Sequence, residues 1–358
     1  MEIAIVIIAY ILTNILIVVN INKFMHIFQQ SFYQIEEFTP ALKTTGAHKI
    51  QLYEIILLIF GSLSFISSYF LILYVFFAIF VAYKTINNRP VAKKKFVYTT
   101  RVKITYSIIA LILIILTYLV CSFSYFKYIN FVFIILSIYK YVAIGIMLLG
   151  NVIALPVLKL LNYHYIKEAK NIINENKKLK IIAITGSYGK TSTKNIVNSI
   201  LEEKYISVMT PKSFNTTLGV VRAIRELVKP YTEVFVCEMG ASKLKDIEDI
   251  CKIVKPDISV ITTIGPQHLT TFKSMENIEK GKFEIITNAK EDAVAVLNID
   301  NNYIKDGIEK YVNGKKIIEY SMNNKEARYT VEDVKMSDKG SIFTVCEGDS
   351  KFTLETRL

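Results

Sequence analysis

One short segment combines the residue types that bind nucleotide phosphates. It reads Thr185-Gly186-Ser187-Tyr188-Gly189-Lys190-Thr191-Ser192, and it follows an apolar run and precedes a helical pattern. Glycines let backbone N–H groups surround phosphate oxygens, and the start of a helix adds positive potential. The Lys190 ammonium can reach the β- and γ-phosphates, and the Thr191 hydroxyl can bind Mg²⁺. The segment therefore predicts a phosphate-binding loop of the short G-x-x-G-K-[ST] form.

Two further polar side chains follow other apolar runs. Glu238 ends the run 233–238, and His268 comes shortly after the run 257–262. The carboxyl ends of parallel strands meet at one edge of a sheet, where ligands bind. A carboxylate at this edge suits Mg²⁺. His268 is either a residue of the same site or an ordinary surface or core histidine.

The elements that position these residues alternate between two patterns. Short β-rich runs predict strands at 181–185, 234–238, 258–262 and 293–298. Helical patterns between and around them cover 191–203, 217–228, 243–254 and 275–288. This alternation is typical of an α/β fold with a doubly wound, mostly parallel sheet. Residues 158–178 form either a basic amphipathic connector or a solvated helix.

The first half of the chain has a different composition. The whole protein has 358 residues, is 52% hydrophobic and carries a formal charge of +12, yet residues 1–165 hold thirteen Lys and Arg against four Asp and Glu. Apolar runs long enough to cross a bilayer lie at about 3–21, 53–83, 104–126 and 130–155. We expect four membrane helices, or five if Gly61 and Ser62 divide the second run. The placement of the basic excess favours a membrane protein over a nucleic-acid binder.

Loop charge predicts the orientation of these spans. The loop 84–103 contains seven basic residues, namely Lys84, Arg89, Lys93, Lys94, Lys95, Arg101 and Lys103. Positive loops stay on the cytoplasmic side, so this loop and everything after Pro156 should be cytoplasmic. We expect a multi-pass protein of the cell membrane, in contact with lipids, with a cytoplasmic catalytic domain. Lys140, inside the last run, could contact a lipid phosphate, snorkel to the interface or pair within the helix bundle.

The cysteines indicate neither a zinc cluster nor a disulfide framework. Cys121 lies within an apolar run, and Cys237, Cys251 and Cys346 form no C-x-x-C pair. This pattern fits a reducing compartment for the second half.

Six motifs in one order resemble the ATP-binding middle domain of the Mur ligase family. They are Thr185–Thr193, Ser213-Phe-Asn-Thr-Thr-Leu-Gly219, Glu238-Met-Gly-Ala241, Thr263-Ile-Gly-Pro-Gln-His-Leu269, Glu279-Lys-Gly-Lys-Phe-Glu284 and Val296-Leu-Asn-Ile-Asp300. Within the family they are most similar to the D-alanyl-D-alanine-adding, or MurF, type. The resemblance covers 179–358, about half of the chain. Together with the apolar runs, this divides the chain into a membrane region at 1–157, a connector at 158–178 and the ligase-like domain at 179–358.

The resemblance also implies roles for individual residues. Lys190 and the loop amides would bind the phosphates of ATP, and Thr191 and Glu238 would bind one Mg²⁺. His268 would serve a second Mg²⁺ together with Lys282, which matches a lysine that the family tends to carry as a carbamate. A carbamate offers oxygen ligands to a hard cation, whereas an ammonium repels it.

Three asparagine and threonine positions complete the implied site. Asn215 and Thr216 match the family's position near the γ-phosphate and the carboxylate substrate, and Asn298 matches the position at the adenine edge. Asn215 and Asn298 could otherwise be turn formers.

The implied reaction is ATP-dependent amide ligation through an acyl phosphate. For the MurF type the acid is a muramoyl-tripeptide and the amine is D-alanyl-D-alanine, which places the reaction in peptidoglycan synthesis. One alternative is a membrane-bound ligase of the poly-γ-glutamate kind. Another is a non-catalytic nucleotide-binding scaffold at the membrane.

The chain departs from the family pattern at both ends. Membrane spans stand where the family has a soluble UDP-binding domain, which makes a lipid-linked or membrane-proximal substrate conceivable. The family continues beyond a stretch like 316–358 to a His-Asn motif and a C-terminal lid domain. We therefore expect this chain to be truncated and to need that domain for turnover.

Overall fold

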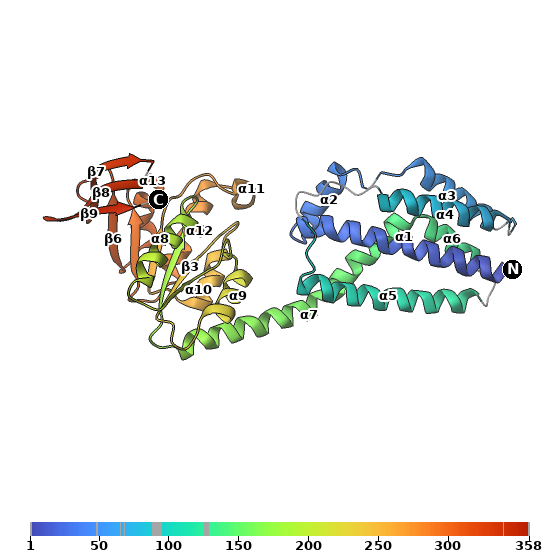
Figure 1. Ribbon diagram of the computed structural model, residues 1–358, viewed down its shortest axis with the longest axis horizontal. Helices are drawn as coiled ribbons and strands as arrows, with labels where there is room; N and C mark the ends of the chain where they lie inside the picture. Colours follow the sequence, from blue (N-terminus) through green and yellow to red (C-terminus); the bar gives the residue numbers. More distant parts are fainter. Residues whose placement is uncertain are drawn as a thin grey trace. The chain divides into compact units, whose positions relative to one another are not determined.

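The computed structural model describes residues 2–47, 49–64, 66–67, 69–87, 95–124, 129–338 and 340–356. The chain divides into two compact units, Met1–Leu160 and Leu161–Leu358. Figure 1 shows helices alone in the first unit and a sheet with helices in the second. Each unit has its own hydrophobic core and is described by itself.

The described part of the first unit consists of helices, most of which are apolar. In chain order they are α1 (Glu2–Gln30), α2 (Ile35–Thr44), α3 (Leu52–Leu63), α4 (Tyr69–Asn87), α5 (Thr100–Ser124), α6 (Ile129–Ser137) and α7 (Tyr139–Glu175), the last of which continues into the second unit. Among the described residues, four helical stretches are long and apolar enough to cross a membrane: Ala4–Gln30, Tyr69–Asn87, Thr100–Val120 and Tyr139–Glu175. The number of membrane spans, four or five, stays a prediction, because these helices are identified by length and composition alone.

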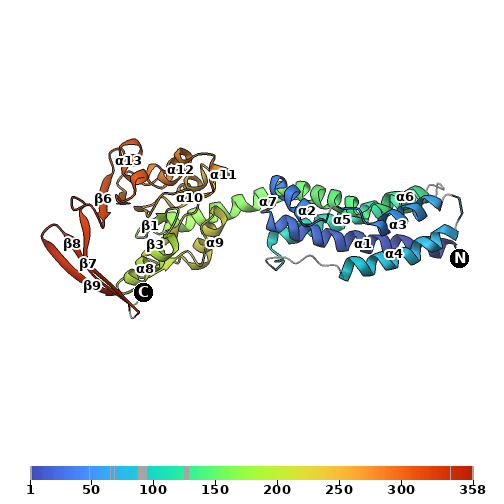
Figure 2. The same ribbon diagram turned by 90° about the horizontal axis from the view of Figure 1, so that it is seen from above.

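The apolar run 53–83 is two helices rather than one. α3 ends at Leu63, just after Gly61 and Ser62, and α4 begins at Tyr69. Gly61 also permits close packing, because a Cβ there would lie 2.6 Å from the Ser137 hydroxyl of α6. Figures 1 and 2 show α3 beside α6 and α1 beside α4 within this unit. The glycine therefore allows close contact between the two short helices α3 and α6.

Lys140 forms a buried contact between helices. Its Nζ lies 2.6 Å from Oε1 of Glu54 on α3 and donates a hydrogen bond to the Lys49 carbonyl at 3.1 Å. The Tyr139 hydroxyl donates to the same Glu54 oxygen at 2.8 Å. Of the three roles considered for Lys140, pairing within the bundle is the one that the structure shows. In the basic loop 84–103, residues 88–94 lie outside the described residues.

The second unit is built on a nine-stranded sheet. Its strands are β1 (Lys180–Thr185), β2 (Ser207–Met209), β3 (Val234–Glu238), β4 (Ile258–Ile261), β5 (Val294–Asn298), β6 (Lys316–Ser321), β7 (Tyr329–Ser337), β8 (Gly340–Glu347) and β9 (Ser350–Thr356). Their order is β2-β3-β1-β4-β5-β6-β7-β8-β9, parallel as far as β7 and antiparallel beyond it. Figure 2 shows β7 to β9 in red at one edge. The predicted mostly parallel sheet is confirmed, whereas β2 and the individual strands after β5 were not predicted.

Helices cover both faces of this sheet. They are α8 (Lys190–Glu202), α9 (Thr217–Leu227), α10 (Asp246–Val254), α11 (Leu269–Phe272), α12 (Met275–Thr287) and α13 (Asn302–Tyr311). On one face, Ile184 and Val236 pack in a cluster with Val197 of α8. On the other, Ala183 and Phe235 pack in a cluster that includes α9, α10, α12 and α13. Neighbouring residues of one strand thus enter two cores, as a doubly wound sheet requires.

The end of α7 belongs to the second core. Ala169 is fully buried there, and Tyr165, Ile166, Ile172 and Ile173 pack against the same cluster. The segment 158–178 is therefore helical as far as Glu175 and presents an apolar face to the sheet unit.

Candidate active site

The predicted phosphate loop connects β1 to α8 in a backbone conformation that needs glycine. Gly186 has φ +153° and Gly189 has φ +81°, both in the region that side chains disfavour. A Cβ on Gly186 would also collide with the Thr262 hydroxyl. Both glycines of the motif therefore have a structural reason, and glycine-rich loops of this kind bind anions through their backbone N–H groups.

The loop that follows β4 holds the phosphate loop in place. The Ser187 N–H donates to the Thr263 carbonyl at 2.7 Å, and the Ser187 hydroxyl donates to the Gly265 carbonyl at 2.9 Å. The Thr262 hydroxyl donates to the Tyr188 carbonyl at 2.6 Å. The residues after β4 thus fix the loop from one side.

Lys190 folds back over the loop. Its Nζ donates to the Gly186 carbonyl at 2.6 Å and to the Ser187 carbonyl at 3.3 Å. Burial lowers the pKa of this lysine, and the nearby Glu238 charge partly offsets the effect. The ammonium lies where phosphate oxygens could replace the two carbonyls as its partners.

Glu238 is the centre of the site. It ends β3, is 1% exposed, and accepts a hydrogen bond from the Thr191 hydroxyl on Oε2 at 3.0 Å. The Asn215 amide donates to Oε1, also at 3.0 Å. Because Thr191 donates its only proton to Glu238, its oxygen lone pairs remain available to a cation. A hydroxyl and a carboxylate oxygen are ligands that Mg²⁺ prefers, so these residues fit the implied metal.

Lys194 is a site residue that the sequence reasoning missed. Its Nζ lies 3.2 Å from Oε2 of Glu238, and both side chains are 1% exposed. It also donates to the Lys212 carbonyl at 2.7 Å. The available signal was its spacing, because a lysine four residues after Lys190 lies on the same face of the helix.

Asn215 and Thr216 occupy the loop before α9. Thr216 is the N-cap, and its hydroxyl accepts a hydrogen bond from the Gly219 N–H at 3.3 Å. The Asn215 carbonyl accepts from the Gly240 N–H at 2.7 Å. A Cβ on Gly240 would lie 2.9 Å from Cγ of Asn215, so this glycine allows Asn215 to approach Glu238. The structure brings Asn215 to the site and makes Thr216 the N-cap of α9, and a role of Thr216 at the substrate stays a prediction.

His268 is not joined to the other site residues. It is exposed, has φ +56° and immediately precedes α11. Within the described part of the chain, its imidazole makes no hydrogen bond, and no group of three or more His, Cys, Asp and Glu could hold a metal ion. The role of His268 at a second Mg²⁺ stays a prediction.

Lys282 is buried in α12, close enough to Lys190 for the two charges to interact. It is 1% exposed, and among the described residues its ammonium has no hydrogen-bond or ion-pair partner. Burial and the Lys190 charge lower its pKa to about 8, although Asp246 and Glu284 oppose the change. A lowered pKa makes the neutral amine available near neutral pH, and carbamate formation requires that form. The environment therefore suits the predicted modification.

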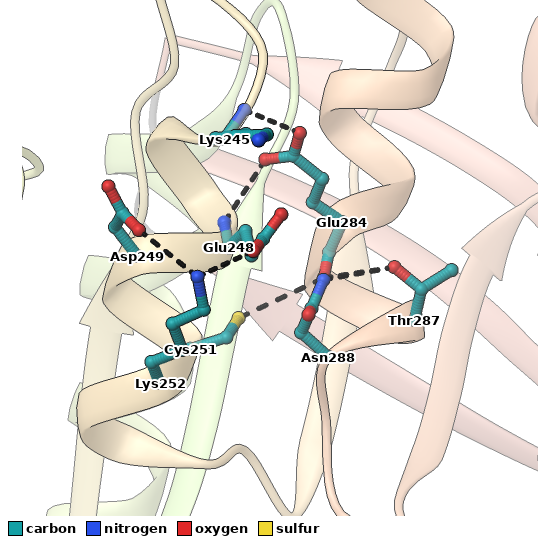
Figure 3. Close-up of polar contacts among 8 residues, drawn as sticks. All are labelled: Lys245, Glu248, Asp249, Cys251, Lys252, Glu284, Thr287 and Asn288. Carbon is teal, nitrogen blue, oxygen red and sulfur yellow. Dashed lines mark hydrogen bonds and ion pairs between the residues drawn. The ribbon is translucent and has the colours of Figure 1, made fainter.

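Glu284 fixes the helix that carries Lys282. Its carboxylate accepts hydrogen bonds from the backbone N–H groups of Lys245 at 2.7 Å and Glu248 at 3.0 Å, at the start of α10 (Figure 3). Figure 3 also shows Lys252 between Glu248 and Asp249, with which it forms ion pairs. Burial raises the pKa of Glu284, and the two N–H groups counteract it. α12 and α10 are thus joined beside the site.

Asn298 lies at the carboxyl end of β5. Its amide donates to the Thr262 carbonyl at 3.1 Å, and its Oδ1 accepts from the Asp300 N–H at 3.1 Å. It therefore lies at the same sheet edge as the phosphate loop and contacts the segment that holds that loop. Contact with an adenine stays a prediction.

The sheet order, the glycine loop after β1 and the carboxylate at the end of β3 define a P-loop α/β domain. The family comparison is consistent with this class. Residues 184–358 match the family described as Mur ligase middle domain, so the second unit of this chain resembles that domain in sequence as well as in fold.

Relatives of the MurF type are similar to this domain. The UDP-N-acetylmuramoyl-tripeptide–D-alanyl-D-alanine ligase of Buchnera aphidicola is 34% identical over 173 residues, which are 48% of this chain and 37% of that protein. The enzyme of the same name from Bacillus subtilis is 32% identical over 166 residues, or 46% of this chain and 35% of that protein. The chain thus spans little more than a third of the length of these relatives.

Solved structures agree with the fold. The MurF ligase of Thermotoga maritima in complex with ADP superposes on this chain with a TM-score of 0.50 and 29% sequence identity. The superposition covers 54% of this chain and 44% of the Thermotoga chain. MurF from Acinetobacter baumannii superposes with a TM-score of 0.51 and 24% sequence identity. This superposition covers 55% of this chain and 42% of the Acinetobacter chain. The predicted resemblance to the MurF type is confirmed.

Proposed function

We propose that the protein is an ATP-dependent carbon–nitrogen ligase of the MurF type that uses Mg²⁺. The observation that carries the proposal is the contact between Thr191 and Glu238 at the mouth of the glycine loop. This contact places two oxygen ligands for the cation beside a loop of the phosphate-binding type, and phosphoryl transfer needs both. The similar MurF ligase of Thermotoga maritima is in complex with ADP, which supports nucleotide binding by this protein.

The proposed reaction has two steps. A substrate carboxylate oxygen attacks the γ-phosphorus of ATP and ADP leaves, which gives an acyl phosphate. An amine then attacks the acyl carbon, phosphate leaves, and the nitrogen loses a proton. Lys190 binds the phosphate oxygens, and Asn215, held between Glu238 and Gly240, orients the acid. Mg²⁺ held by Thr191 and Glu238 would neutralise the charge that develops on the phosphate.

The names of the relatives support a choice of substrates. We propose a muramoyl-tripeptide as the acid and D-alanyl-D-alanine as the amine, in peptidoglycan synthesis. We further propose that residues 1–157 form a multi-pass region of the cell membrane, that 158–178 connect it to the ligase domain at 179–358, and that this domain is cytoplasmic. Four apolar helices support the membrane region.

Product analysis tests the ligase. The full protein is incubated with Mg·ATP, a muramoyl-tripeptide and D-alanyl-D-alanine, and ADP, phosphate and the ligated peptide are measured. A Glu238→Gln variant should lose product formation. The matched control is Glu233→Gln, because Glu233 is exposed and lies just before the first residue of the same strand, at the end opposite to Glu238. Nucleotide binding without ligation of any muramoyl peptide would contradict the proposal and favour a nucleotide-binding scaffold. Ligation of glutamate instead would favour the poly-γ-glutamate kind.

A further inference from the structure

Lys194 lies where two parts of the site meet. It follows Lys190 by one turn of α8 and is almost completely buried. Its ammonium contacts Oε2 of Glu238 at 3.2 Å and the Lys212 carbonyl at 2.7 Å. One charged group therefore joins the end of β3 to residues 210–216, the β2–α9 loop.

The β2–α9 loop has a strained backbone at the point that Lys194 contacts. Lys212 has φ +47°, a left-handed conformation that residues other than glycine rarely adopt. Such a conformation persists only where the surroundings determine it. The hydrogen bond from the Lys194 ammonium to the Lys212 carbonyl is a constraint of this kind.

The other end of the loop returns to the same carboxylate. Asn215 donates to Oε1 of Glu238 at 3.0 Å, and its carbonyl accepts from Gly240 at 2.7 Å. Lys194, Glu238, Asn215 and the loop thus form a closed ring of contacts. A buried carboxylate is costly unless it is paired, and Lys194 supplies the balancing charge.

We propose that Lys194 is a positioning residue that holds Glu238 and the β2–α9 loop as one unit, so that cation binding at Glu238 is coupled to the order of the loop that carries Asn215. The inference rests on the proposed function for the role of Glu238 at the cation. Its contacts, however, are made by this chain alone. A test without nucleotide can therefore separate the two proposals.

Hydrogen exchange provides that test. The full chain is solubilised in detergent without metal or nucleotide, and wild type is compared with Lys194→Met, which keeps the length of the side chain but removes its charge and hydrogen bonds. Amide exchange across 211–216 should become at least tenfold faster, whereas exchange within β1 should stay at the wild-type rate. Wild-type exchange across 211–216 in the variant would overturn the proposal.

A second measurement uses the cation. ATP affinity is measured by calorimetry with Mg²⁺ and with EDTA, and the ratio of the two affinities is compared between proteins. Lys194→Met should reduce this ratio at least tenfold and leave the affinity in EDTA unchanged, which a purely structural role would not do. An unchanged ratio would overturn the proposal. If wild type binds no nucleotide, the proposed function fails, and hydrogen exchange alone decides the role of Lys194.

Two variants control for stability. Asn198→Leu removes another buried hydrogen bond of α8, the one with the Ser207 hydroxyl at 2.8 Å, without touching Glu238. It should lower the melting temperature but change exchange across 211–216 less than twofold. If Lys194→Met does not fold, Lys194→Met with Glu238→Gln removes both buried charges together. That double variant should still lose protection of the β2–α9 loop, and retained protection would overturn the proposal.

Discussion

The carboxylate of Glu284 accepts a hydrogen bond from the backbone N–H of Glu248 at 3.0 Å, so a side chain of α12 caps the start of α10. Lys245 adds a second N–H to the same carboxylate. Three acidic residues already lie in the first turn of α10, which suits the positive end of a helix. Lys282 lies two residues before Glu284, so this contact also determines the position of the buried lysine.

We predict that Glu284→Gln loosens this contact. A glutamine has one acceptor oxygen and directs its NH₂ group at a backbone N–H, so one buried donor is left unpaired. The expected cost is about 1–3 kcal/mol of unfolding free energy. Thermal unfolding of the full chain measures it, with Glu276→Gln on the exposed part of the same helix as control. Equal melting temperatures for the two variants would contradict the prediction.

Lys190→Ala should weaken ATP binding at least tenfold, or about 1.4 kcal/mol, because it removes the charge at the phosphate loop. Calorimetry in the presence of Mg²⁺ measures the affinity. The control is Lys204→Ala, an exposed lysine just beyond the other end of α8. Unchanged affinity in Lys190→Ala would show that the loop does not bind the nucleotide.

Lys282 should act as a carbamate. Lys282→Ala is expected to lose turnover in the full enzyme and to regain part of it when a short-chain carboxylate is supplied. Lys282→Arg should stay inactive, since arginine keeps the charge but cannot supply oxygen ligands. Lys280, exposed on the same helix, gives the control variant Lys280→Arg. Wild-type ligation by Lys282→Arg in low-bicarbonate buffer would exclude the carbamate.

Asp257 should make stability depend on pH. Burial would raise its pKa, but hydrogen bonds from Lys290, the Ile181 N–H and Lys180 lower it below the ordinary value. A carboxyl whose pKa is lower in the folded state stabilises the fold above its unfolded pKa of about 3.9 and loses this effect as pH falls through the folded value. Asp257→Asn should therefore cost about 1–2 kcal/mol at pH 7 and progressively less below about pH 4.

The check is a series of thermal unfolding experiments from pH 7 to pH 3. Asp292→Asn serves as the control because Asp292 is exposed near the start of β5. A difference between wild type and Asp257→Asn that stays constant over this range would be inconsistent with the ion pairs at 3.2 and 2.9 Å.

The orientation of the membrane region can be tested by labelling. A single cysteine at Lys94, in a chain whose native cysteines are replaced by alanine, should resist an impermeant reagent applied to intact cells. A cysteine at Lys127, beyond the next apolar helix, should be labelled. The positive charge of the loop 84–103 is the reason for this expectation. Ready labelling at Lys94 would mean that the topology is inverted.

The sequence predicts the parts of the fold that have strong local signals. β1 and β3 are continuous apolar runs because both of their faces are covered, and Gly186 and Gly189 are needed for the backbone of the loop. β2 has only three residues, too few for a periodic signal. The antiparallel strands β7 to β9 depend on pairing with one another rather than on burial, and many of their side chains are exposed.

In the site, too, residues within short motifs could be predicted, whereas contacts between residues far apart in the sequence could not. Thr191 and Glu238 follow from motif spacing and from the parallel register that pairs Ile184 with Glu238. The contact of Lys194 with Lys212 could not be predicted, because it depends on a left-handed residue in a loop without a regular pattern. Thr216 illustrates the reverse: its place in a motif suggests chemistry, but its hydroxyl caps a helix.

The hydrogen bonds that join the phosphate loop to the residues after β4 affect the thermodynamics and kinetics of nucleotide capture. Ser187 and Tyr188 are held by Thr262, Thr263 and Gly265 through hydrogen bonds that this chain makes within itself. Ordering a mobile loop normally subtracts from binding free energy, and a loop held in advance avoids that entropy loss. Association at this loop should therefore proceed as a single fast phase whose rate follows nucleotide concentration, without a slow rearrangement behind it.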